Sequence, residues 1–286
     1  ACRCPKLIAP AMNTNMYENP VTQDNLSLLE KYGWEVISPA SGRLACGAVG
    51  PGKLPEPVDL LQHILRHLAL PHDLSGKRVL VSAGPTQEAI DPVRYLTNHS
   101  TGKMGYALAK MAMLRGADVT LVSGPTAIEP PPFLRTIPVV SAQDMYDAIS
   151  ENAPQADFIF MAAAVADYTP TECADNKIKK KDGDMAIPLK RTQDILGFLG
   201  EHRAPGQILC GFSMETQNML ENSRAKLSKK HVDMICANNL KIPGAGFGVD
   251  TNILTLITRD AVTELPKMSK EEAANAILDQ ALALMK

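Results

Sequence analysis

The sequence predicts an α/β protein whose core is a Rossmann-like open sheet, mainly parallel, with helices on both faces. From residue 77 onward, short runs rich in apolar and β-branched residues alternate with longer amphipathic stretches, and this alternation is typical of βαβ units. The hydrophobic content of 45% in 286 residues is enough to fill the core of one large or two ordinary domains.

Strands and helices are expected in strict alternation in this C-terminal part. The expected strands are 78–83, 118–123, 157–163, 207–212 and 232–237. The expected helices are 104–115, 142–152, 193–202 and 215–230. A hairpin from 252–257 and 261–265 should extend the sheet. Ser269 and Glu272 have the spacing of a capping box, which predicts that a final helix begins there.

The composition changes near residue 70. Apolar residues recur at helical spacing over 58–70, and the polar segment 71–76, with its proline and glycine, is typical of a linker. We therefore expect a first domain at 1–70 and a second at 77–286. The chain opens on Ala1, without a first turn or cap, so we expect that an upstream segment is missing.

Charge and cysteine usage exclude several classes of partner. The 29 basic and 31 acidic side chains nearly balance, so we expect neither nucleic acid nor membrane as a partner, and any anion site must be local. No apolar run reaches the ~20 residues that span a bilayer, and no signal peptide is visible, which favours the cytoplasm. The cysteines lack CxxC spacing and are expected to be reduced thiols without zinc: Cys2, Cys4, Cys46, Cys173, Cys210 and Cys236.

Ligands of an open parallel sheet bind beyond the carboxyl ends of its strands. In the loop after the first expected strand, Gly84 would let backbone N–H groups approach a phosphate closely. The loop nevertheless matches neither GxGxxG nor the P-loop pattern, so a plain tight turn explains it equally well.

The segment from Arg94 to Gly105 gathers polar groups directly before an expected helix. Ser100, Gly102 and Lys103 stand where unpaired N–H groups and the helix dipole favour an anion, so a phosphate would fit. Asn98 offers an amide that could hold an acyl phosphate carbonyl while charge develops on its oxygen. Alternatively, Asn98 or Ser100 merely caps the helix.

Small residues follow the third expected strand. Ala162, Ala163 and Ala164 would allow a base or ribose to lie flat against the backbone, and Asp167 could hold a cation or a ribose. The lysines of 177–181 could neutralise a triphosphate, although lysine runs are usually solvated surface.

A further set of residues supports a nucleotide site. Phe212 is expected to end a strand, and Lys226 and Lys230 are one helical turn apart on the same face of a helix. The two lysines could therefore reach a shared anion.

These motifs together resemble a known family. The runs SAGPT, DPVRYLTNHSTGKMG, AAAVADY, KIKK, GFxxET and DMICAN occur in order over nearly all of residues 77–286. The combination closely resembles the phosphopantothenate–cysteine ligase domain of the bacterial bifunctional coenzyme A biosynthesis protein. The resemblance implies that CTP and Mg²⁺ activate 4'-phosphopantothenate as an acyl cytidylate, which L-cysteine then attacks, and that the ligase domain pairs as a homodimer.

The resemblance also implies roles for individual residues. Asn98 should hold and activate the acyl cytidylate, and Arg94 should be needed chiefly for the conversion of that intermediate. Lys177 should bind the nucleotide phosphates. Asp167 is also the expected metal ligand. The expected nucleotide contacts are Gly84, Ser100, Gly102, Lys103, Met161, Ala162, Ala163, Asp167, Lys177, Phe212, Lys226 and Lys230.

Residues 1–70 resemble the C-terminal part of a flavin-dependent decarboxylase. Asn13 lies in a PAMN motif like that of the substrate-binding segment, and Cys46 lies in a segment like the clamp that supplies the proton donor. Lys53 stands where that family more often has arginine, so the charge is kept but the bidentate contact that an arginine can make is lost. The resemblance implies that FMN binding and decarboxylation need the missing N-terminal part, and that the full-length protein forms a larger assembly.

Three alternatives stay open. A nicotinamide-dependent oxidoreductase should carry a glycine fingerprint after its first strand, and the glycines of 244–248 do not follow one. A non-catalytic nucleotide-binding module could dispense with Asn98 and Lys177. An intact decarboxylase would bind flavin and be yellow. The residues themselves leave the choice between CTP and ATP open.

Overall fold

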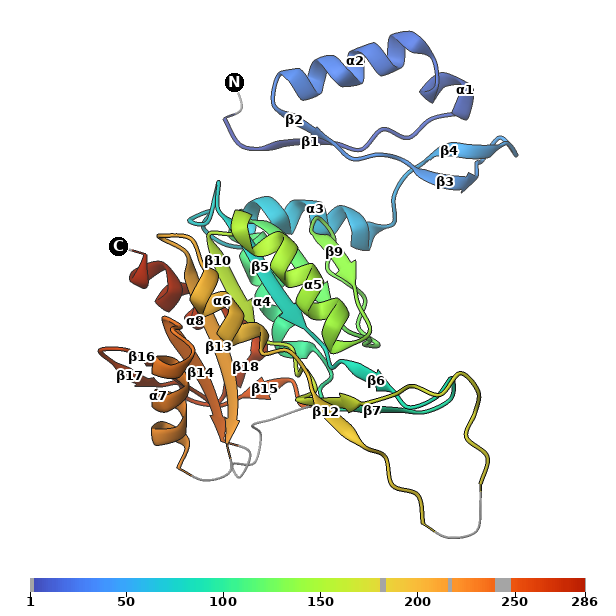
Figure 1. Cartoon of the computed structure of the whole chain (residues 1–286). Helices are drawn as coiled ribbons and strands as arrows, with labels where there is room; N and C mark the ends of the chain where they lie inside the picture. Colours follow the sequence, from blue (N-terminus) through green and yellow to red (C-terminus); the bar gives the residue numbers. More distant parts are fainter. Residues whose placement is uncertain (1–2, 181–183, 216–217, 240–247, 286) are drawn as a thin grey trace. The chain divides into compact units, whose positions relative to one another are not determined.

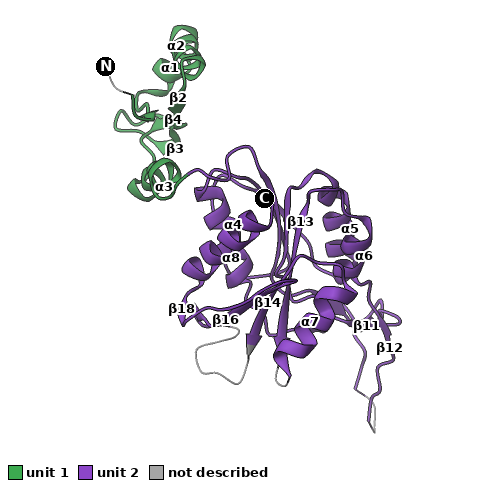
Figure 2. Cartoon of the chain, turned by 90° about the vertical axis from the view of Figure 1, so that its left-hand side faces the viewer, with its two compact units in different colours: residues 1–71 green, residues 72–286 purple. Residues whose placement is uncertain are grey.

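The computed structural model in Figure 1 describes residues 3–180, 184–215, 218–239 and 248–285. The chain divides into two compact units, 1–71 and 72–286 (Figure 2). Some features named from the sequence lie outside the described residues: Cys2, Lys181 and residues 244–247.

The first unit is a small α/β fragment. Its parallel strands β1 and β2 and its antiparallel hairpin β3–β4 are each two-stranded. The helical spacing seen in the sequence corresponds to α3. The elements are β1 (Lys6–Ile8), α1 (Thr14–Tyr17), α2 (Pro20–Lys31), β2 (Trp34–Val36), β3 (Ala40–Arg43), β4 (Val49–Lys53) and α3 (Pro57–Leu68).

The second unit is built on an eight-stranded sheet in the order β17-β16-β14-β13-β10-β5-β8-β9. The six strands from β14 to β9 run parallel, and β16 and β17 are antiparallel additions. The expected open, mainly parallel sheet with a terminal hairpin is thus confirmed. The strands are β5 (Arg78–Ala83), β8 (Asp118–Ser123), β9 (Arg135–Pro138), β10 (Phe158–Met161), β13 (Ile208–Glu215), β14 (Met234–Asn239), β16 (Leu254–Thr258) and β17 (Val262–Glu264).

Helices cover both faces of this sheet, with α4 and α8 on one side and α5 and α6 on the other (Figure 2). Nine residues of α4 are buried because α8 packs over it. The expected capping box at Ser269 and Glu272 opens α8, and no described helix has the length and apolarity needed to cross a bilayer. The helices are α4 (Lys103–Leu114), α5 (Ala142–Asn152), α6 (Ile195–His202), α7 (Met219–Lys229) and α8 (Lys270–Leu284), with a 3₁₀ turn at Ala153–Gln155.

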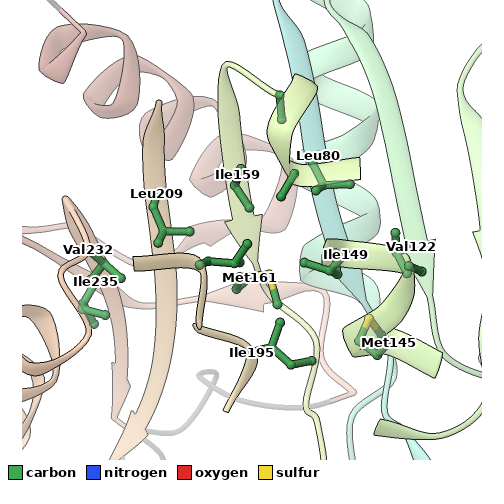
Figure 3. Packing of buried hydrophobic residues seen from close by; sticks show 14 of the residues in the cluster. Leu80, Val122, Met145, Ile149, Ile159, Met161, Ile195, Leu209, Val232 and Ile235 are labelled. Carbon is green, nitrogen blue, oxygen red and sulfur yellow. The ribbon is translucent and has the colours of Figure 1, made fainter. Parts of the chain in front are cut away.

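The hydrophobic core beneath α5 and α6 fixes the sheet. Figure 3 shows Met145 and Ile149 of α5 packed beside Leu80, Ile159 and other aliphatic residues of the central strands. Because these side chains are essentially inaccessible to water, their burial is the main term that stabilises the arrangement.

Short two-stranded ribbons stand at the carboxyl end of the sheet. The pairs β6–β7 and β11–β12 are antiparallel and project away from the sheet in Figure 1, and β15–β18 joins the region before α8. Their bounds are β6 (Gln87–Ala89), β7 (Tyr95–Thr97), β11 (Tyr168–Pro170), β12 (Leu189–Arg191), β15 (Thr251–Asn252) and β18 (Met268–Ser269).

Several expected boundaries were wrong, and three of them bear on the site. Strand β10 ends at Met161 rather than at residue 163, because the chain then leaves the sheet and Ala164 bridges to Pro85. Strand β13 continues past Phe212 to Glu215, so that Phe212 lies within the strand, and α7 begins only at Met219.

The order of the strands defines where a ligand should bind. Strand β5 lies between β8 and β10, so the chain runs outward in one direction through β8 and β9 and returns to the other side of β5 through β10. The carboxyl ends of β5 and β10 therefore form a topological switch point, which is where open α/β sheets bind ligands.

Candidate functional site

A pocket of about 960 Å³ opens at this switch point. Four segments line it: 98–104 before α4, 161–168 after β10, 191–196 at the start of α6, and 212–214 in β13. The remaining lining residues come from α7, β14, β15, β16 and α8, and they are Lys226, Lys230, Asn238, Asn252, Leu254 and Lys270.

Hydrogen bonds to its neighbours hold the loop after β10 in place. The backbone N–H of Ala164 donates to the carbonyl of Gly84 at 2.9 Å, and that of Ala166 donates to the hydroxyl of Thr86 at 3.0 Å. On the other side of the loop, the hydroxyl of Thr192 donates to the carbonyl of Ala166 at 2.6 Å. The small side chains of this loop therefore leave a fixed stretch of backbone along the pocket.

Asn98 is attached to the same loop and does not cap α4. Its Nδ2 donates to the carbonyls of Ala164 and Val165 at 3.1 and 3.2 Å. The N-cap of α4 is Gly102, which has φ +80° and receives no side-chain cap, while Ser100 accepts from the N–H of Gly102 at 3.3 Å. The amide nitrogen of Asn98 is therefore engaged with this loop.

Gly84 and Gly102 allow three backbone segments to pack closely beside the pocket. A Cβ on Gly84 would lie 2.9 Å from the carbonyl oxygen of Gly124, and a Cβ on Gly102 would lie 2.8 Å from Cγ2 of Thr126. Gly102 lines the pocket, whereas Gly84 is not among its lining residues. The structure therefore gives Gly84 a packing role.

The paired lysines of α7 both face the pocket, but each has its own partner. Nζ of Lys226 donates to the carbonyl of Phe212 at 2.7 Å, and Lys230 forms an ion pair with Asp194 at the start of α6. Phe212, Lys226 and Lys230 all line the pocket.

The pocket is much more basic than the chain as a whole. Among its described lining residues are five basic side chains, Lys103, Arg191, Lys226, Lys230 and Lys270, and two acidic ones, Asp167 and Asp194. The formal net charge of the whole chain is −2. A local field of this kind attracts an anionic ligand even though the whole molecule does not.

Comparisons with known proteins agree with this geometry. Residues 74–285 match the family described as DNA/pantothenate metabolism flavoprotein C-terminal domain, and residues 1–69 match the family described as Flavoprotein. The coenzyme A biosynthesis bifunctional protein CoaBC of Bacillus subtilis is 48% identical over 290 residues, an alignment that includes all of this chain and 71% of that protein.

The chain belongs to the CoaBC family. A crystal structure of a CoaBC C-terminal domain covers 74% of this chain and 97% of its own, at 44% identity and a TM-score of 0.63. A structure described as Cab2 mutant H337A in complex with phosphopantothenate-cysteine shares the fold, with a TM-score of 0.61 and 17% identity over 80% of this chain and 96% of its own. The family that the motifs indicated is thereby confirmed, as is its place in coenzyme A biosynthesis.

Besides Gly84, two residues expected at the site, Arg94 and Lys177, lie outside the pocket lining. Arg94 pairs with the buried carboxylate of Asp91, and its Nη2 donates to the carbonyl of Ile178 at 3.1 Å. Asp91 also accepts from the N–H of Ile178, and these bonds, led by that to Arg94, hold the pKa of Asp91 well below its usual range. Arg94 therefore fixes the segment that carries the exposed Lys177, whereas the side-chain amide of Asn98 donates to the loop after β10.

Asp167 is the one expected metal ligand of the CoaBC pocket. It is exposed, it lines the pocket, and its carbonyl accepts from the N–H of Thr192 at 3.1 Å. The described residues contain no cluster of three or more His, Cys, Asp or Glu side chains that could hold a metal alone. Mg²⁺ commonly takes one or two carboxylates together with substrate phosphates and water, so the carboxylate of Asp167 would suffice for this ion if a phosphate were bound beside it.

Sequence reasoning missed Lys270 and Asn238. Lys270 is only 7% exposed, and its Nζ donates to the carbonyl of Thr251 at 3.0 Å. Burial lowers the pKa of Lys270, and the nearby charge of Lys103 lowers it further. The one signal in the sequence was its position directly after Ser269, where a helix start disfavours a cation.

The two CoaBC-like residues of the first unit do meet. Nδ2 of Asn13 donates to Sγ of Cys46 at 3.1 Å. Hydrogen bonds from the backbone at Ala48 and from Asn13 lower the pKa of the Cys46 thiol. The exposed thiol is thus easier to ionise than an ordinary cysteine.

Proposed function

We propose that the second unit joins 4'-phosphopantothenate to L-cysteine in two steps and uses CTP to activate the carboxylate. The observation that carries this proposal is the pocket at the switch point, where Asn98 and the loop after β10 lie among basic side chains. Membership of the CoaBC family supports it, because that family acts in coenzyme A biosynthesis.

In the first step, a carboxylate oxygen of phosphopantothenate attacks the α-phosphorus of CTP. A new O–P bond forms, the bond from that phosphorus to pyrophosphate breaks, and an acyl cytidylate results. Lys226 and Lys230 bind and orient the polyphosphate, and the backbone of Ala162 and Ala163 supports the nucleoside. Mg²⁺ held by Asp167 would neutralise charge on the phosphates.

In the second step, the amine of cysteine attacks the acyl carbon. The C–N bond forms, the C–O bond to the cytidylate breaks, and CMP leaves while the amine gives up a proton to the solvent. Asn98 holds the acyl cytidylate beside the loop after β10, and its amide hydrogens shift from the carbonyls of Ala164 and Val165 toward the oxygen on which charge develops.

Lys177 and Arg94 act from the neighbouring segment in this proposal. Lys177 binds nucleotide phosphates when this segment approaches the pocket in the proposed homodimer, and Arg94 holds the segment through Ile178. In the first unit, we assign Asn13 to substrate binding and Cys46 to proton donation in an FMN-dependent decarboxylation that the longer protein would perform.

The test is pyrophosphate release by the purified chain with phosphopantothenate, Mg²⁺ and either CTP or ATP, with and without cysteine. We expect release that requires phosphopantothenate and is faster with CTP. Faster release with ATP would contradict only the choice of nucleotide and not the proposed reaction. A folded protein that binds CTP and releases no pyrophosphate with either nucleotide would instead be a non-catalytic nucleotide-binding module.

A further inference from the structure

One end of the pocket has no role in the steps above. It is formed by Lys103, Asn238, Asn252 and Lys270, which all line the pocket, and we call it the basic end. These residues come from α4, β14, β15 and α8, so distant parts of the chain converge there.

Lys270 occupies a position that is unfavourable for a lysine in three ways. Its side chain is buried, which penalises a charge. It is the first residue of α8, where the helix dipole favours an anion. It also lies near enough to Lys103 for the two charges to interact, and the pKa of Lys270 is lowered mainly by burial and then by that charge, an effect that the carboxylate of Asp250 offsets only in part. A bound anion would relieve all three effects, and residues that break local rules in this way are concentrated at functional sites.

Asn238 gives an independent indication of a ligand. It is 6% exposed, and its Oδ1 has no hydrogen-bond partner among the described residues. A buried amide oxygen is rarely left without a donor. Asn238 lines the same pocket and pairs in the sheet with Leu254, two residues from Asn252, so a hydroxyl or N–H group of a bound ligand would satisfy it.

The charges at this end match a phosphoryl group better than a carboxylate. Lys103 reaches the carbonyl of Gly248 and the carboxylate of Asp250 at 2.8 and 2.6 Å, but the Asp250 side chain is 90% exposed and is therefore well solvated. The twelve-residue helix α4 begins beside Lys103 without a side-chain cap. Two ammonium groups and a helix start suit a dianion.

We propose that Lys270 binds a phosphoryl group of a substrate at the basic end, together with Lys103 and the start of α4, while Asn238 accepts a hydrogen bond from the same ligand. This inference rests on the proposed function, which offers two sources of the phosphoryl group. One is the polyphosphate of CTP, and the other is the 4'-phosphate of phosphopantothenate.

The test compares wild-type protein with Lys270→Met by calorimetric titration of four ligands. The ratio of the Kd values of CMP and CTP measures recognition of the polyphosphate, and the ratio for pantothenate and phosphopantothenate measures recognition of the 4'-phosphate. In Lys270→Met we expect one of these two Kd ratios to be about 10- to 100-fold smaller than in the wild-type protein, the usual effect of losing a hydrogen bond to a charged group. The ratio that falls identifies the source.

Two variants control for other effects. Lys267→Met removes an exposed lysine three residues away and should change neither ratio. Lys270→Gln keeps a donor for the carbonyl of Thr251, and it decides the question in the same way if Lys270→Met does not fold. A folded Lys270 variant with both ratios unchanged overturns the inference. A wild-type protein that binds neither CTP nor phosphopantothenate removes the proposed function, and this inference with it.

Discussion

Asn98→Asp is expected to slow formation of the cysteine adduct by about 10²- to 10³-fold, the usual cost of losing one preorganised donor. The change is nearly isosteric, but it replaces an NH₂ group with a charged oxygen. That oxygen would face the carbonyls of Ala164 and Val165, to which Asn98 now donates. It would also repel the charge that develops on the acyl cytidylate. Single-turnover measurements of pyrophosphate release and of adduct formation separate the two steps.

The matched control is Asn25→Asp, which makes the same charge change at an exposed position in α2. It should leave both steps unchanged. Pyrophosphate release by Asn98→Asp should fall less than adduct formation, so that acyl cytidylate accumulates. Adduct formation at the wild-type rate would show that Asn98 has no part in the chemistry.

Lys226→Met is expected to raise the KM for CTP by about 10- to 100-fold, as for loss of a charge-assisted hydrogen bond to phosphate. The lysine lines the pocket, and its ammonium group is held at the carbonyl of Phe212 in β13. The KM for cysteine should stay within about twofold, because the lost charge belongs to the phosphate site. Steady-state kinetics with each substrate varied in turn give both values.

Lys229→Met supplies the control for this variant. Lys229 is exposed, also in the last turn of α7, and is not among the pocket residues. Equal effects of the two substitutions on the KM for CTP would mean that the general charge of α7, rather than a specific contact from Lys226, attracts the nucleotide.

Much of the fold could be predicted because its signals are local. The strands at 78–83 and 118–123 and the helix at 142–152 have the predicted bounds. Each strand is a buried apolar run that begins at a charged residue, and Ser141 and Asp144 form a capping box at the start of the helix.

The end of β13 was not predictable in the same way. The predicted strand ended at residue 212, yet Ser213 is buried in the strand, and its hydroxyl bonds to that of Ser223 in α7 at 2.8 Å. This tertiary contact offsets the weak strand preference of serine. Local sequence could not show it.

The sequence predicted which loops form the candidate site, but it could not predict the hydrogen bonds that join them. Position after a strand or before a helix indicated Ser100, Asp167 and the residues around them. The attachment of Asn98 to carbonyls 66 and 67 residues away depends on the sheet order. A lysine at the start of a helix is ordinarily solvated. The burial of Lys270 instead depends on β15, where the carbonyl of Thr251 accepts a hydrogen bond from its ammonium group.

The central claim is that the second unit activates a carboxylate as an acyl cytidylate. Phosphopantothenate labelled with ¹⁸O in both carboxylate oxygens tests it most directly, with mass spectrometry of all products after reaction with CTP, Mg²⁺ and cysteine. The account predicts one ¹⁸O in CMP and one in the new amide, because the attacking oxygen leaves with the cytidylate. Label in inorganic phosphate, with CDP as the nucleotide product, would show an acyl phosphate instead and would contradict the account.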